Sequence, residues 1–126
     1  MRRGVFIAAM LAASAFSASV AVAQATPRGN ALAYEAALKC FVANGHASGL
    51  RARAGEPQRA AAYDLSARQS FDAATRLGQL LGYSNQRISQ DFGLVQSREL
   101  PAMVADAAYF RQTVATCRAL GLMPRD

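Results

Sequence analysis

Apolar residues recur every three or four positions along most of the chain, which is the spacing that places them on one face of an α-helix. The longest such run extends from Ala60 to Leu81. Its polar side carries charges of alternating sign at intervals of four residues: Asp64, Arg68, Asp72 and Arg76. Opposite charges at this spacing stabilise a solvated helix face, so we interpret the two aspartates as surface ion-pair partners and not as catalytic carboxylates.

Three shorter periodic runs predict three further helices. The first begins at Asn30, a residue type that caps helices, and ends at the pair Asn44-Gly45. Residues 46–56 are basic and contain glycine, which indicates a connection. Pro57 suits the first turn of the long second helix.

The remaining boundaries follow from residues that cap or stop helices. Gly82 ends the second helix, Ser84 caps the third, and the fourth begins between Glu99 and Pro101. Gly121 then ends the fourth helix. No segment alternates with a period of two, so the sequence predicts an all-α fold, a small bundle of about four helices.

The N-terminus has the order of parts of a secretory signal peptide. Two basic residues, Arg2 and Arg3, precede an uncharged stretch that ends in the small-residue triplet Ala21-Val22-Ala23. We expect cleavage after Ala23, with residues 1–23 as the signal peptide, 24–29 as a flexible lead and 30–126 as a single helical domain. The alternative is an uncleaved segment that anchors the chain in the inner membrane.

The composition indicates a small core and, with the N-terminal segment removed, an exported protein without a membrane span. The chain has 126 residues, of which 52% are hydrophobic, but much of this share is alanine, which buries little area. Removal of the two N-terminal arginines lowers the formal net charge from +6 to +4. The remaining apolar runs are too short to span a bilayer, and we expect a periplasmic or secreted protein.

The two cysteines, Cys40 and Cys117, fall on the inward faces of the first and last predicted helices. Two cysteines in an exported protein predict one disulfide, which would close a loop of about 78 residues and stabilise the fold by about 4.5 kcal/mol. Both lie near helix C-termini, which an up-down-up-down bundle would not bring together. Either residues 46–56 form a helix of their own, or one helix packs across the others.

The single histidine, His46, follows the expected end of the first helix. It can interact with the helix C-terminus or act as a general base. No second histidine and no free cysteine accompany it, so a hydrolase that uses His46 is the weakest of the functions that we consider.

Two polar groups of residues are candidates for a binding surface. Guanidinium groups suit phosphate and carboxylate partners, whereas both groups can also be ordinary solvated residues. The candidates are Arg51, Arg53 and Arg59 around the first connection, and Tyr83, Asn85 and Arg87 at the start of the third helix.

The sequence contains no motif of a nucleotide-binding, hydrolase or zinc-protease site, and export argues against a nucleic-acid partner. We expect no cofactor and no metal. The function that we expect is a non-catalytic binding or accessory module of the bacterial envelope, with a protein or an anionic envelope component as partner. The alternative is a small-molecule or lipid carrier with a pocket between helices.

Overall fold

The computed structural model describes residues 26–125, and in this range the chain forms four helices and no strand. The helices are α2 (Pro27–Arg53), α3 (Pro57–Leu80), α4 (Asn85–Ala105) and α5 (Ala107–Ala119). The predicted all-α fold of about four helices is therefore confirmed. The expected signal peptide lies outside the described residues. No helix within the described range is long and apolar enough to cross a membrane.

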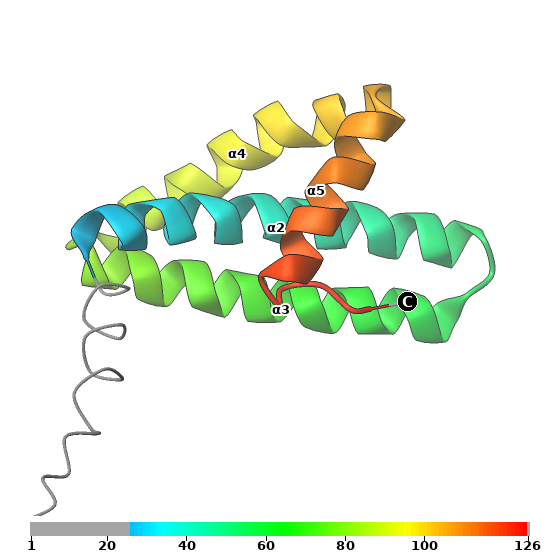
Figure 1. The fold of residues 1–126 in the computed structure, drawn as a ribbon, viewed down its shortest axis with the longest axis horizontal. Coiled ribbons are helices and arrows are strands. Elements are labelled where there is room, and N and C mark those ends of the chain that lie inside the picture. The colour runs from blue at the N-terminus through cyan, green and yellow to red at the C-terminus, as the bar shows by residue number, and fades with distance from the viewer. Residues whose placement is uncertain (1–25, 126) are drawn as a thin grey trace, which may run out of the picture.

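The helices form two unlike pairs (Figure 1). The long helices α2 and α3 lie side by side as an antiparallel hairpin. Helix α4 starts beside the N-terminal end of α2 and slopes away from it, and α5 then returns across α2. Helices α4 and α5 thus form a V-shaped pair that packs on α2 of the hairpin.

Three of the four helices end in the same glycine motif. Gly55, Gly82 and Gly121 have φ angles of 76°, 80° and 72°, the left-handed region in which a side chain is disfavoured. In each case the next residue donates its backbone N–H to a carbonyl five residues back, as in the bond of 2.9 Å from Glu56 to Arg51. This is the Schellman arrangement, which satisfies the last carbonyls of the helix, and it confirms the predicted stops at Gly82 and Gly121.

The predicted end of the first helix at Asn44-Gly45 is wrong. Helix α2 continues to Arg53, so most of the expected connection 46–56 is helical. Gly45 does not adopt a positive φ, and Asn44 is fully buried, with its Nδ2 donating to the Cys40 carbonyl (2.9 Å) and to the Leu122 carbonyl (2.7 Å). An asparagine that is held by tertiary contacts does not stop a helix, and Gly55 supplies the left-handed residue instead.

The expected start of the first helix is also displaced. Thr26 caps α2 by accepting a hydrogen bond of 3.1 Å from the backbone N–H of Gly29, and Pro27 occupies the first turn. Residues 27–29 of the expected flexible lead are therefore helical, and Asn30 does not cap. By contrast, Pro57 begins α3 and Ser84 caps α4, as predicted.

The last helix begins later than expected. Helix α4 passes through Pro101 and ends at Ala105. The break comes at Asp106, whose extended backbone leaves the helix and whose carboxylate accepts from the N–H groups of Ala108 (3.0 Å) and Tyr109 (3.1 Å). Aspartate is a preferred N-cap residue, whereas Pro101 only removes one hydrogen bond within α4.

The predicted disulfide is present between Cys40 and Cys117, with a Cα–Cα distance of 5.7 Å. Cys40 lies in the middle of α2, because that helix is longer than predicted, and Cys117 lies near the end of α5. Of the two arrangements that would allow the bridge, the structure has the crossing one: α5 packs across α2 (Figure 1).

The core is small and rich in alanine, as the composition suggests. One cluster surrounds the disulfide and includes Met103 and Tyr63, and the other joins Leu38, Ile88 and Phe92. Small buried side chains allow α2 and α3 to approach closely along their length: Ala37, Ala43, Ala47, Ala60, Ala67 and Ala74.

Candidate functional site

Helix α5 separates two grooves on the surface of the hairpin. The α4-side groove lies between the N-terminal half of α2, helix α4 and helix α5, and it has a volume of about 720 Å³. The α3-side groove lies between the C-terminal half of α2, the start of α3 and the opposite side of α5, with about 540 Å³. Because the disulfide fixes α5 on α2, it holds a wall of both grooves.

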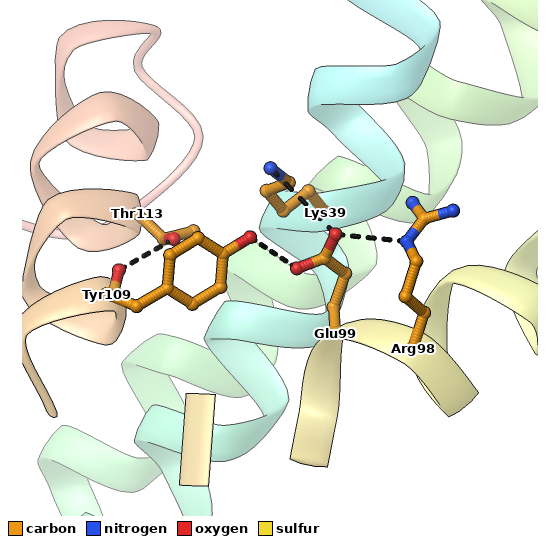
Figure 2. A network of polar contacts seen from close by, with 5 residues as sticks. All are labelled: Lys39, Arg98, Glu99, Tyr109 and Thr113. Carbon is orange, nitrogen blue, oxygen red and sulfur yellow. Dashed lines mark hydrogen bonds and ion pairs between the residues drawn. The ribbon is translucent and has the colours of Figure 1, made fainter. Parts of the chain in front are cut away.

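A network around Glu99 joins the three helices of the α4-side groove (Figure 2). Glu99 is buried, and its Oε2 accepts a hydrogen bond from the Tyr109 hydroxyl on α5. Its Oε1 lies 3.2 Å from Nε of Arg98 and 3.9 Å from Nζ of Lys39 on α2. Thr113 donates to the Tyr109 carbonyl one turn back (3.0 Å). One carboxylate thus connects α2, α4 and α5.

The surroundings of Glu99 favour its charged form. Burial by itself raises the pKa of a carboxyl group, but the hydrogen bond from Tyr109 and the positive charges of Lys39 and Arg98 outweigh it. The pKa of Glu99 is therefore lower than its ordinary value. The group is an anion at neutral pH, and it serves to hold the helices together rather than to donate a proton.

A second paired cluster lies at the other end of the same groove. The Tyr34 hydroxyl donates to Asp91 at 2.7 Å, and Arg87 lies 3.5 Å from the same carboxylate. The guanidinium of Arg87 also stacks over the ring of Tyr83, 3.6 Å from its centroid. Burial and the bond to the Asp91 carboxylate raise the pKa of Tyr34 above its ordinary value. This phenol therefore stays neutral.

In two ion pairs at the α4-side groove, the cation and the carboxylate differ in exposure. The Arg98 side chain is 68% exposed, whereas that of its partner Glu99 is 9% exposed. Arg87 and Asp91 show the same order, with the cation more exposed than the carboxylate. Exposed Leu32 and Leu94 also line the groove. The groove therefore presents leucine side chains and the cations of Arg87 and Arg98 to solvent, together with the exposed carboxylate of Glu35 on α2.

The α3-side groove has a different chemistry. Its apolar lining consists of Ala47 and Leu50 from α2, Tyr63 from α3, and residues of α5 including Phe110 and Val114. Its charged lining consists of Arg51, Arg111 and Arg118, with no carboxylate among the described lining residues.

The structure does not bring the two predicted groups of site residues together. Tyr83 and Arg87 line the α4-side groove, near the turn between α3 and α4. The arginines lie at the opposite end of the hairpin (Figure 1), where Arg51 and Arg59 share the Glu56 carboxylate at 3.5 and 3.1 Å. The two groups are therefore parts of separate surfaces.

The other predicted residues take no part in the grooves. Asn85 is exposed in the first turn of α4 and lines neither groove. Arg53 borders a smaller hollow of about 350 Å³, which also contains His46. The His46 ring packs edge-on against Phe110, with 4.7 Å between the centroids.

The surroundings of His46 do not supply a catalytic partner. No carboxylate or hydroxyl group is found among the described residues that line its hollow. Burial and the charge of Arg53 lower the pKa of His46, so its neutral form is favoured. A histidine base needs a group that orients it, and the described lining of this hollow offers no carboxylate or hydroxyl for that role.

Sequence reasoning missed the residues that define both grooves. Lys39, Glu99 and Tyr109 meet only because α4 and α5 diverge from α2 at particular angles, which no local pattern encodes. A signal did exist for the α3-side groove, since Arg111 and Arg118 are seven residues apart and so share a helix face.

Comparisons with known proteins found no counterpart for this chain: no protein-family model, no curated protein and no solved structure matches it.

Proposed function

We propose that this chain is a non-catalytic binding module of the bacterial envelope and that its α4-side groove receives a segment of a protein partner. The observation that carries the proposal is the groove itself, with exposed leucines and with exposed arginines whose carboxylate partners are less exposed than they are. A groove between packed helices is a common site for an amphipathic segment of another protein.

The charges of the groove define the chemistry of the partner segment. The carboxylates of Asp91 and Glu99 already have partners within the fold, whereas the heads of Arg87 and Arg98 reach solvent beside the exposed Glu35. An acidic segment would pair with these heads, and its apolar side chains would cover Leu94 and Leu32. A basic segment would face three cations, Lys39, Arg87 and Arg98, against one exposed carboxylate, Glu35, and this repulsion disfavours binding.

The location in the envelope is supported by two separate features. The N-terminal sequence has the parts of a signal peptide. The disulfide between Cys40 and Cys117 is typical of an oxidising compartment. Both features predict an exported protein, and neither depends on the identity of the partner.

A photocrosslinking amino acid at residue 94, compared with one at residue 80, tests the proposal. Leu94 and Leu80 are exposed to similar extents, 65% and 71%, but only Leu94 lines the groove. In intact cells we expect position 94 to give a discrete protein adduct that maps to an acidic amphipathic segment, and position 80 to give none.

A second experiment leaves Leu94 unchanged and places the crosslinker at residue 32 on the facing helix. The adduct formed from position 32 should contain the same partner segment, and its yield should fall when Arg98 is replaced by alanine. Equal labelling from positions 94 and 80, or an adduct that maps to a basic segment, would contradict the proposal.

A further inference from the structure

We propose that the hollow beside His46 is a second binding site, for the anion of a small carboxylic acid with an apolar body, and that binding is accompanied by uptake of a proton on His46. This hollow, the His46 hollow, lies between the C-terminal half of α2 and helix α4 and has a volume of about 350 Å³. It shares no described lining residue with the α4-side groove, so the inference does not depend on the proposed protein partner.

The first argument is the direction of the Arg53 side chain. His46, Gly49 and Arg53 follow one another at intervals of three and four residues, so they share a face of α2. A β-carbon built on Gly49 would lie 3.4 Å from Nη1 of Arg53, so the guanidinium lies over this glycine, one turn back from the end of the helix. The charge of Arg53 also acts on the His46 ring, which places both groups at the same part of the hollow.

The second argument is that Arg53 has no carboxylate partner within the fold. Among residues 26–125 its side chain makes no ion pair and no hydrogen bond, and the described lining of the hollow contains no acidic residue. A guanidinium group matches a carboxylate through two parallel hydrogen bonds. A carboxylate ligand would therefore supply a partner that the fold does not provide.

The third argument is the apolar part of the lining. Phe41 and Val42 of α2 and Leu100 of α4 line the hollow, and Gln96 adds a neutral polar group. Gly45 leaves open space, since a β-carbon built on it would meet no atom within 4 Å. The volume is at the small end of the range for small-molecule sites, which suits an acid with a short apolar body.

The uptake of a proton follows from the charges around His46. Burial and the charge of Arg53 lower the pKa of His46. The other described neighbours of the ring are neutral: α4 lines the hollow with Gln96 and Leu100, α5 places Phe110 at 4.7 Å between ring centroids, and α3 contributes no lining residue. A bound carboxylate would offset the charge of Arg53 and raise the pKa of His46. Because linkage is reciprocal, the ligand binds more tightly as the pH falls.

An NMR titration of the oxidised protein with hexanoate, at pH 6 and at pH 8, tests both parts of the proposal. His46 is the single histidine of the sequence, so its ring-proton resonance is identified directly in protein without a histidine tag. We expect saturable binding of one hexanoate per chain, about threefold tighter at pH 6 than at pH 8, and a higher pKa of His46 at saturation. Acetate and hexylammonium should bind at least about tenfold more weakly, because each lacks one half of the recognised chemistry.

A first pair of variants separates the site from net charge. Arg53→Gln should weaken hexanoate binding about tenfold, in line with the loss of charge-assisted hydrogen bonds. It should also raise the pKa of His46 without any ligand, because it removes the neighbouring charge. Arg76→Gln makes the same change of charge at an exposed residue near the other end of the hairpin and should do neither.

A second pair of variants tests the hollow itself. Gly45→Leu should fill it and abolish hexanoate binding, whereas Gly93→Leu, outside the hollow on α4, should not. A β-carbon on either glycine meets no atom within 4 Å, and leucine favours a helix more than glycine does, so both variants should fold, as thermal unfolding can check. His46→Gln should bind hexanoate at pH 8 as the unaltered chain does, but without the pH dependence.

Several outcomes would overturn the proposal. Absence of saturable hexanoate binding at both pH values would remove the site. Equal binding of acetate would indicate a simple anion site, and equal binding of hexylammonium would indicate nonspecific hydrophobic contact. A pKa of His46 that did not change at saturation would contradict the uptake of a proton. Equal losses in Arg53→Gln and Arg76→Gln, or full binding by a folded Gly45→Leu protein, would place the ligand elsewhere.

Discussion

The two grooves share helix α5 as a wall, but they differ in the charged residues that line them. In the α4-side groove the carboxylates of Asp91 and Glu99 lie beneath the cations and pair with them. In the α3-side groove three arginines gather without a carboxylate in the described lining. The first arrangement holds helices together through ion pairs that cross between them. The two grooves therefore differ in the charged residues of their described lining, although they share one wall.

The difference arises from the helix that faces α5 on each side. Helix α4 supplies Asp91 and Glu99, the two carboxylates that pair with cations at the first groove. The first half of α3 supplies Tyr63 to the second groove. Tyr63 is uncharged, and its hydroxyl accepts a hydrogen bond from Arg118. A single crossing helix thus presents one face to acidic residues and the other to neutral ones.

The largest effect is expected from loss of the disulfide, because it removes the wall that both grooves share. Replacing Cys40 and Cys117 together with serine should lower the free energy of unfolding by about 4.5 kcal/mol, the chain-entropy estimate for a loop of this length. Urea unfolding followed by circular dichroism measures the change.

Reduction of the unaltered protein is the control for this variant, since it breaks the same bond without changing residues. A loss of less than about 1 kcal/mol in both samples would mean that packing alone holds α5 on α2.

A smaller effect, confined to the α4-side groove, is expected from Glu99→Gln. Lys39 and Arg98 would lose their carboxylate, with a cost of about 1–3 kcal/mol at neutral pH. The pKa of Glu99 is lowered in the folded state, so its contribution is fully present above the unfolded pKa of about 4.5 and is lost as the pH falls through the folded value. Unfolding measured from pH 7 to pH 3 should show the difference between the two proteins shrinking in acid.

Glu35→Gln is the matched control, because Glu35 is an exposed carboxylate that lines the same groove. It should change stability little at any pH. A Glu99→Gln protein that kept the full acid sensitivity of the unaltered chain would contradict the assigned role of Glu99.

The smallest change in stability is expected from replacing one arginine of each groove. Arg98→Ala removes an exposed partner of Glu99 and should cost up to about 1 kcal/mol. Arg111→Ala relieves repulsion among like charges and should leave stability unchanged or raise it by a few tenths of a kcal/mol, about the size expected for surface charges. Thermal unfolding at low and at high salt measures both, and salt should reduce both effects. The distinction between the grooves would fail if the two variants changed stability in the same direction.

The sequence predicted those parts of the fold that depend on local chemistry. Helical periodicity gave the all-α class, and glycine at positions 82 and 121 gave two helix ends. The predictions failed where a tertiary contact decided between two local signals. Asn44-Gly45 and Gly55 both resemble helix stops, and the burial of the Asn44 amide against Cys40 and Leu122 decided for Gly55.

The same limit applies to the candidate sites. The predicted pair Tyr83 and Arg87 does line a groove, but neither Lys39 nor Glu99 carried any local mark of function. His46, which stood out as the single histidine, lies against Phe110 in a hollow without a carboxylate or hydroxyl among its described lining. The type of a residue therefore drew attention to His46 without indicating what would surround it.

The amino-acid sequence by itself determined the number of helices, about half of their ends and the pairing of the two cysteines. Helix periodicity and capping depend on neighbouring residues, and two cysteines allow only one pairing. Only the tertiary structure decided that α5 crosses α2 and thereby creates two grooves of different charge. The angle between helices depends on which side chains interdigitate along their whole contact, and residues that are 60 positions or more apart, such as Lys39 and Glu99, meet as a consequence of that angle.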